Sequence, residues 1–341
     1  MLVKARNRTR LTQRPKFGLV IPTFLGGVRG SEVPSLETLV EFAQRIEELK
    51  FESAWVIDHL LVGEPIYRCT WYEPLTVLTS MAAVTKRVKL GTSVLVLPIR
   101  NPAILAKQIA TMDHLSKGRI ILGVGNGWWD KEFEACGVPK NERGPRVSET
   151  VQILRKLWTG EPTDYSGKFF SFKGITMEPR PFQKPYPPIW IAGGTAVGKA
   201  ENVYSVKAQS VLKRIARLGD GWIARAVTTP DKILEDYVRI KEFARQYDRD
   251  PENIVFAHLN FVHITDEDDV RMDSARQAFS KISNLPFEDI KREYIVGPKK
   301  VVTERLDTLI KLGIQHLIVW PTGPDYKTLE FLADEVMPRY K

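Results

Sequence analysis

The stretch VKLGTSVLVLPIRNPAILAKQIATMDHLSKGRIILGV, residues 88–124, decides the fold class. Its aliphatic, β-branched opening at 88–97 predicts a buried strand. Asn101 is a favourable capping residue and Pro102 suits a first helical turn, so a helix is expected over 102–115. The apolar run 120–124 predicts a second buried strand. Two strands joined by a helix-length connection run parallel, so this stretch predicts one β-α-β unit.

The same alternation of strand and helix recurs along the whole chain. Further strands are expected at 17–21, 54–57, 189–192, 221–223, 255–264 and 316–319. Helical spacing is expected at 36–49 after the capping residue Ser35, and at 74–85, 146–158, up to 218, 230–247, 266–283, 301–312 and 326–336. Eight such units predict an α/β fold of the (β/α)8 TIM-barrel type, in preference to a doubly wound open sheet.

Two segments depart from this rhythm. Residues 1–16 form a basic N-terminal tail, and residues 17–341 are expected to form a single barrel domain. Residues 161–187 are aromatic and proline-rich and are interpreted as an insertion in the barrel. We expect this insertion and the loop at 61–73 to shape the substrate pocket.

Composition excludes several classes of function. The 341 residues carry 50 Lys+Arg against 41 Asp+Glu, and the basic residues are interleaved with acids, so no nucleic-acid partner is expected. No apolar run approaches the roughly 18 residues of a membrane span. Cys69 and Cys136 form no CxxC pair, which indicates a reducing compartment, and a cytoplasmic location is expected. The five histidines are spaced irregularly, so no metal site is predicted.

Asp58-His59 follows the second predicted strand, and catalytic groups of TIM barrels gather at the carboxyl ends of strands. Histidine moves protons near neutral pH, and an aspartate can orient an imidazole or accept a hydrogen bond from a ring N–H. The alternative is that Asp58 only caps the next turn. Trp128-Trp129, after a glycine turn, are either core residues or a wall for a planar ligand.

Gly193-Gly194-Thr195 follows the fifth predicted strand. Glycines there let backbone N–H groups approach a phosphate at a helix start, although a tight turn needs glycine without any ligand. The longer run 193–199 resembles a P-loop, but Ala200 stands where a hydroxyl should bind magnesium. A nucleotide triphosphatase is therefore disfavoured. The GxGxG run at 123–127 does not match a dinucleotide fingerprint.

Taken together, the motifs resemble the bacterial luciferase-like superfamily, and within it the branch that uses coenzyme F420, a deazaflavin. The resemblance runs in order from about 17 to 320. The motifs that carry it are Asp58-His59-Leu60, LGTSVLVLP at 90–98, NPAILAKQ at 101–108, MDHLSKGR at 112–119, LGVGNGW at 122–128, PIWIAGG at 188–194 and GDGW at 219–222.

This resemblance implies a tricyclic ring in the mouth of the barrel. It implies that Asp58 hydrogen-bonds the polar edge of the ring and that His59 acts on the substrate as acid or base. It also implies a bulge at Ser93-Val94 with a non-proline cis peptide. The remaining residues that it assigns to the cofactor are Thr92 beside the bulge, Asn126 and Gly127 near the tail, and Gly193, Gly194 and Thr195 at the phosphate.

The expected activity is hydride transfer between coenzyme F420 and a small organic substrate, in a homodimer. The alternative is an FMN-dependent monooxygenase supplied by a separate cofactor reductase. A P-loop module and a non-enzymatic barrel are the other readings. The connection 196–211 departs from the family by its length, and Lys199 and Lys207 in it could meet a polyglutamate tail or face solvent.

Overall fold

A computed structural model describes residues 14–26, 33–62, 67, 69–196, 208–269 and 271–340. The predicted basic tail lies outside the described residues up to residue 13, and Lys16 already belongs to the first strand. The connection 197–207, with Lys199 and Lys207, also lies outside them. No helix of the described chain is long and apolar enough to cross a membrane.

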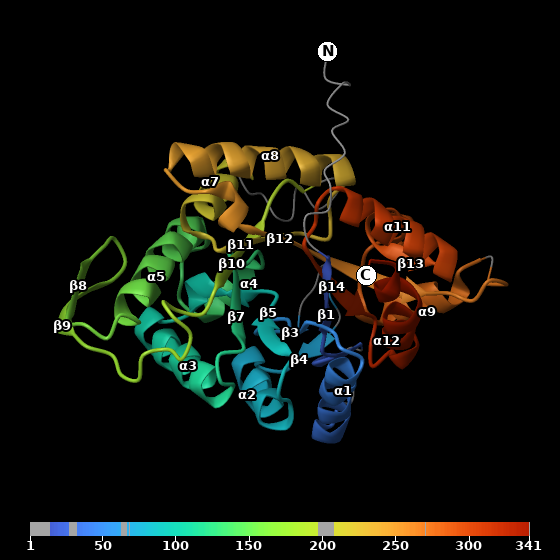
Figure 1. The fold of residues 1–341 in the computed structure, drawn as a ribbon, viewed down its shortest axis with the longest axis horizontal. Coiled ribbons are helices and arrows are strands. Elements are labelled where there is room, and N and C mark those ends of the chain that lie inside the picture. Colours follow the sequence, from blue (N-terminus) through green and yellow to red (C-terminus); the bar gives the residue numbers. More distant parts are fainter. Residues whose placement is uncertain are drawn as a thin grey trace, which may run out of the picture.

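Eight parallel strands close into a barrel (Figure 1). They are β1 (Lys16–Val20), β3 (Ser53–Val56), β5 (Lys89–Thr92), β7 (Ile120–Gly125), β10 (Ile189–Gly193), β11 (Gly221–Ala224), β12 (Val255–Ile264) and β14 (His316–Pro321). Each strand pairs with the next in this order, β10 pairs with β7 and β14 pairs with β1, so the cylinder has no open edge. The predicted TIM barrel is confirmed.

Helices surround the cylinder. They are α1 (Leu36–Glu48), α2 (Pro74–Val84), α3 (Pro102–Leu115), α5 (Arg143–Leu157), α7 (Ala208–Leu218), α8 (Pro230–Gln246), α11 (Lys299–Lys311) and α12 (Tyr326–Phe331). The expected caps are present: Ser35 Oγ accepts from the N–H of Thr38, and Asn101 Oδ1 accepts from the N–H of Ala103. These bonds satisfy amide groups that have no partner inside the helix.

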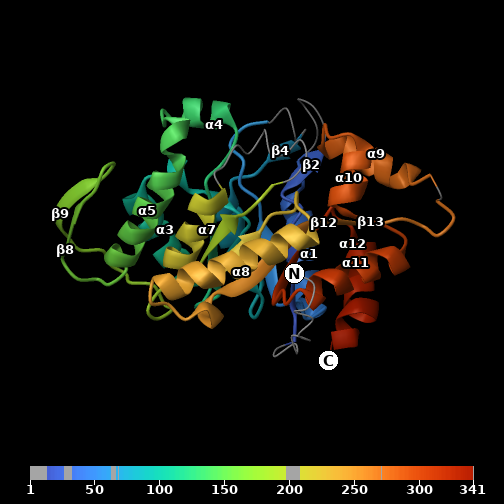
Figure 2. The same cartoon turned by 90° about the horizontal axis from the view of Figure 1, so that it is seen from above.

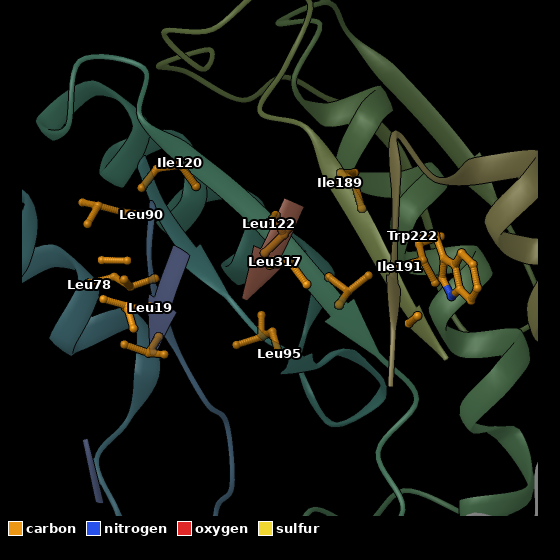
Figure 3. Packing of buried hydrophobic residues seen from close by; sticks show 14 of the residues in the cluster. Leu19, Leu78, Leu90, Leu95, Ile120, Leu122, Ile189, Ile191, Trp222 and Leu317 are labelled. Carbon is orange, nitrogen blue, oxygen red and sulfur yellow. The ribbon is translucent and has the colours of Figure 1, made fainter. Parts of the chain in front are cut away.

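Apolar side chains fill the space between strands and helices, as Figure 3 shows for Leu78 of α2 against Leu19 and Leu90 of the barrel. Inside the cylinder, Trp55 and Trp190 pack with ring centroids 5.4 Å apart. Gly91 leaves room for them, since a Cβ there would lie 2.3 Å from the Trp55 ring. The interior is therefore packed, and space for a ligand must lie at the rim.

Short elements cap the rim at the carboxyl ends of the strands (Figure 2). They are the antiparallel pair β2 (Phe24–Gly26) and β4 (Cys69–Trp71), and the helices α4 (Asp130–Ala135), α9 (Asp273–Ile282) and α10 (Phe287–Glu293). The sequence analysis did not predict α10 or the following strand β13 (Ile295–Gly297), because each is too short for a clear period. The helix expected from 266 was placed too early, since α9 begins at Asp273.

The third predicted strand, 88–97, is interrupted in the structure. A cis peptide joins Ser93 to Val94, as the family resemblance implied, and divides the run into β5 and β6 (Leu95–Val96). Both parts pair with β7. The interruption places residues 93–94 at the mouth of the barrel.

The insertion is a hairpin of β8 (Thr163–Ser166) and β9 (Ser171–Ile175) at one edge of the molecule (Figure 1). Its turn is anchored by buried Glu149 of α5, whose carboxylate accepts from the backbone N–H groups of residues 168, 169 and 170. None of residues 161–187 lines the cleft described below, so a role of this insertion in shaping the substrate pocket stays a prediction.

Candidate active site

A cleft with an empty volume of about 970 Å³ opens at the carboxyl ends of the strands. Its walls come from the ends of β3, β7, β10, β11, β12 and β14 and from the bulge after β5. Asp58 and Gly193 both line it, so the strand ends that the resemblance assigned to one site are brought together. Most of the described lining is apolar, as is usual for a site that holds a planar organic ligand.

His59 stands at this rim and is held by a buried carboxylate. Glu132 of α4 is fully buried, and its Oε1 lies 3.1 Å from His59 Nδ1. The same oxygen accepts from the backbone N–H of Leu60 at 2.7 Å. A carboxylate at Nδ1 fixes the ring as the tautomer protonated there, which leaves Nε2 with a lone pair. His59 can therefore accept a proton at Nε2.

Asp58 is also buried, and its carboxylate is partly used within the protein. Arg100 Nη2 donates to both oxygens at 3.0 Å, and the N–H of Val96 donates to Oδ2 at 2.8 Å. Burial raises the pKa of Asp58, while the Arg100 charge opposes this rise. A carboxylate accepts about four hydrogen bonds, so one acceptor position remains for a ligand N–H. The ring-binding role of Asp58 stays a prediction that this geometry permits.

Ser93 and Val94 line the cleft, as expected. The buried Ser93 hydroxyl has no hydrogen-bond partner among the described residues, so it is available to a ligand. Thr92 differs from its predicted place. Its hydroxyl donates to the carbonyl of Gly123 at 2.6 Å and it does not line the cleft, because its side chain ties β5 to β7.

Asn126 and Gly127 line the cleft beyond β7. Gly127 has φ 69°, and a Cβ there would lie 2.6 Å from Val96, so the turn requires glycine. Asn126 Oδ1 accepts from Arg214 Nη1 at 3.1 Å. The amide nitrogen of Asn126 is thereby left to donate elsewhere.

The expected phosphate turn has an unexpected neighbour. Gly193 lines the cleft, while Gly194 and Thr195 do not. Thr195 donates its N–H and its hydroxyl to the two oxygens of buried Asp236 on α8. These donors are therefore occupied by a carboxylate, and a phosphate could use them only by displacing Asp236. That this turn binds the cofactor phosphate stays a prediction, and Gly193 is the residue of the turn that lines the cleft.

Aromatic rings surround His59. Trp71 and Trp128 lie with ring centroids 5.0 and 5.6 Å from the imidazole. Tyr67, Trp128 and Trp320 line the cleft, so the loop after β3 does contribute to it as expected. Trp129 is buried, so the Trp128-Trp129 pair divides into one wall residue and one core residue.

Sequence analysis gave no role to four charged residues of this site: Glu132, Arg100, Arg214 and Asp236. Each lies tens of residues from the side chain that it contacts, so no local spacing could reveal the pair. These pairs could have been predicted only by knowing which strand-end loops face each other across the barrel.

A closed barrel with a histidine and a buried carboxylate at the rim of an apolar cleft has the layout of a TIM-barrel enzyme. Residues 15–295 match the family described as luciferase-like monooxygenase. The chain belongs to this family, which confirms the resemblance and the expectation of an enzyme.

Two relatives are similar over nearly the whole chain. The F420-dependent glucose-6-phosphate dehydrogenase of Kribbella flavida is 32% identical, over 88% of this chain and 93% of its own length. The enzyme of the same description from Amycolatopsis mediterranei is 29% identical, over 89% and 94%. An F420-dependent secondary alcohol dehydrogenase, solved with an F420-acetone adduct, shares the fold with a TM-score of 0.78 at 19% identity, over 96% of this chain and all of the other.

Proposed function

We propose that this protein is a coenzyme F420-dependent oxidoreductase that transfers hydride between the cofactor and a small alcohol or its carbonyl product. The observation that carries this proposal is His59, held by Glu132 at the rim of an apolar cleft. The relatives of similar length use the same cofactor by name, which supports F420 over the FMN alternative.

The residues of the cleft fit a tricyclic deazaflavin. Val94, Ile223 and Ala192 offer apolar surface to a ring face. Ser93 Oγ, without a partner among the described residues, and the remaining acceptor position of Asp58 suit the polar edge of the ring. Held by these residues, F420 would supply the hydride acceptor for oxidation of an alcohol and the hydride donor for the reverse reaction.

His59 handles the accompanying proton. Oxidation of an alcohol to a carbonyl releases one hydride from carbon and one proton from oxygen, so a base must stand at the hydroxyl. His59 Nε2 takes that proton, and the Glu132 carboxylate stabilises the imidazolium that results. In the reverse direction the same nitrogen returns the proton.

Tyr67, Trp128 and Trp320 give the substrate end of the cleft an aromatic wall. Planar rings suit the C–H face of a sugar or a compact apolar alcohol. Among the described lining residues, Arg225 is the one Lys or Arg, so it is the group that would meet a phosphorylated substrate. Glucose-6-phosphate, the substrate named for the relatives, is accordingly the first candidate to test.

The test follows F420 reduction with glucose-6-phosphate, unphosphorylated glucose and secondary alcohols as separate substrates. Reduction by at least one of them, abolished in His59→Ala, supports the proposal. Reduced FMN and oxygen are offered in parallel. Oxygenation with FMN and no turnover with F420 would establish the monooxygenase alternative. A homodimer and a separate cofactor reductase remain predictions for which sizing and reconstitution are the measurements.

A further inference from the structure

Arg214 is a buried cation whose hydrogen-bond partners among the described residues are neutral. It lies on α7 with only 8% of its surface exposed. Its Nε donates to Ser148 Oγ at 2.9 Å, and its Nη1 donates to Asn126 Oδ1 at 3.1 Å. No carboxylate pairs with it among the described residues. Buried charges are ordinarily paired, since taking an ion out of water costs several kcal/mol.

The surroundings of Arg214 add positive potential and do not neutralise its charge. Burial and the charge of nearby Arg217 lower the pKa of Arg214 to about 10. The guanidinium also lies against the start of α5, because a Cβ on Gly144 would be 2.8 Å from Arg214 Nη2. That helix has no acidic residue in its first turn and no side-chain cap. Its N-cap residue is Glu142, whose carboxylate pairs with Arg146 of the same helix, and the N–H groups of its first turn add a partial positive charge next to Arg214.

Arg214 does not line the cleft itself, but it contacts a residue that does. Val211, one helical turn earlier on α7, lines the cleft, as does Asn126, to which Arg214 donates. Helices α5 and α7 lie side by side outside β10 (Figure 1). In strand order, β5 and β7 separate β10 from β3, which carries His59. Arg214 thus lies behind the part of the cleft wall that Asn126 and Val211 form.

We infer that Arg214 is the counter-ion of an anionic group, a phosphate or carboxylate, on the tail of the bound cofactor. This inference rests on the proposed function, because F420 carries such groups beyond its ring. Arg214 also orients Asn126, whose amide nitrogen then donates into the same part of the cleft. At the Thr195 turn, the Asp236 carboxylate occupies the N–H and hydroxyl donors that a phosphate would use. An anionic group of the cofactor therefore needs a cation elsewhere, and Arg214 provides one.

The experiment compares two ligands on two variants. The ligands are F420 and the same deazaflavin shortened to its ring and ribityl chain, without phosphate or glutamate. Arg214→Met removes the charge at similar volume. Lys213→Met is the matched control, because Lys213 is exposed on the same helix and carries the same charge. Binding is followed by deazaflavin fluorescence, and folding by thermal melting without ligand.

Arg214→Met should weaken F420 binding about 10- to 100-fold, since hydrogen bonds to charged groups are worth more than neutral ones. It should leave the affinity for the shortened ligand and the melting temperature unchanged. Lys213→Met should change neither affinity, and Arg214→Lys should recover part of the loss. For the wild type, raising salt from about 50 to about 500 mM should weaken F420 more than the shortened ligand. This last comparison holds even if Arg214→Met fails to fold.

Equal loss of both ligands in Arg214→Met, or a lower melting temperature with unchanged F420 affinity, would overturn the inference in favour of a packing role. A raised KM for a phosphorylated substrate with unchanged F420 affinity would assign the anion to the substrate and overturn the cofactor assignment. Equal salt dependence of the two ligands would also contradict it. Failure of the wild type to bind either ligand would instead refute the proposed function.

Discussion

At the scale of single residues, the two buried carboxylates Asp58 and Glu132 have different partners. Glu132 holds the His59 imidazole, whereas Asp58 holds Arg100 and the N–H of Val96. The first arrangement controls where a proton sits on a base. The second fixes the wall against which a ring would lie.

Glu132→Gln tests the first arrangement. The amide oxygen can still accept from Leu60, so we expect the fold to persist, but the charge that stabilises protonated His59 is lost. Turnover should fall about 100-fold or more, in the range of general-base contributions, while F420 affinity and melting temperature stay unchanged. Glu134→Gln, exposed on the same helix, is the control. A variant that retains most of its kcat would show that Glu132 is only structural.

Comparison of Asp58→Ala with His59→Ala tests the division of roles. Asp58→Ala should weaken cofactor binding more, because it removes an acceptor at the cleft and leaves Arg100 without its main partner. His59→Ala should mainly lower turnover. Kd from fluorescence and kcat from F420 reduction separate the two effects. Equal losses of both quantities in the two variants would mean that the roles are wrongly assigned.

At the scale of elements, the hairpin β8–β9 depends on Glu149. Its carboxylate accepts from three successive N–H groups of the turn, and loss of these acceptors leaves the turn unsatisfied. Glu149→Ala should lower the free energy of unfolding by roughly 1–3 kcal/mol and increase proteolysis within 163–175. F420 affinity should not change, because the hairpin is absent from the cleft lining. A large loss of cofactor binding would contradict this separation.

The barrel strands also carry two buried histidines that make stability depend on pH. Burial lowers the pKa of His316 to about 3 and of His258 to about 4. Both titrate near 6.5 when unfolded, so the unfolded chain binds protons first as the pH falls. Their contribution is complete above about pH 6.5 and is lost toward the folded pKa values, by roughly 2 kcal/mol per histidine at about pH 5.

Denaturant unfolding at about pH 7.5 and about pH 5 measures this dependence, and His316→Phe supplies the comparison. His316 Nε2 lies 2.7 Å from Ser53 Oγ, which accepts from Trp55 Nε1, so the hydroxyl proton of Ser53 can be donated to a neutral imidazole. Removal of His316 should make the loss of stability on acidification smaller. An unchanged pH dependence in the variant would contradict the assignment.

Most strands and helices could be predicted from the sequence because each shows a clear period or cap. The helix 102–115 matches α3 residue for residue, and the strand 255–264 matches β12. The short α10 and β13 could not be predicted, since they form by packing on neighbours. For the same reason the partners of Thr92 and Thr195 were missed. Their hydroxyls look available in sequence, but the fold gives them Gly123 and Asp236.

At the scale of the whole molecule, closure of the barrel brings distant strand ends to one cleft. Asp58 after β3 and Gly193 at the end of β10 line the same space, although more than a hundred residues separate them. His59 lines this space just after β3, and Arg214 of α7 lies behind Asn126 of its wall. The proposed ligand, with a redox ring and an anionic tail, would use both positions.

The measurement that tests this most directly is a titration of the purified protein with F420 and, separately, with FMN. We predict saturable F420 binding with a Kd of about micromolar order, and no saturable binding of FMN over the same range. Saturable FMN binding without F420 binding would contradict it.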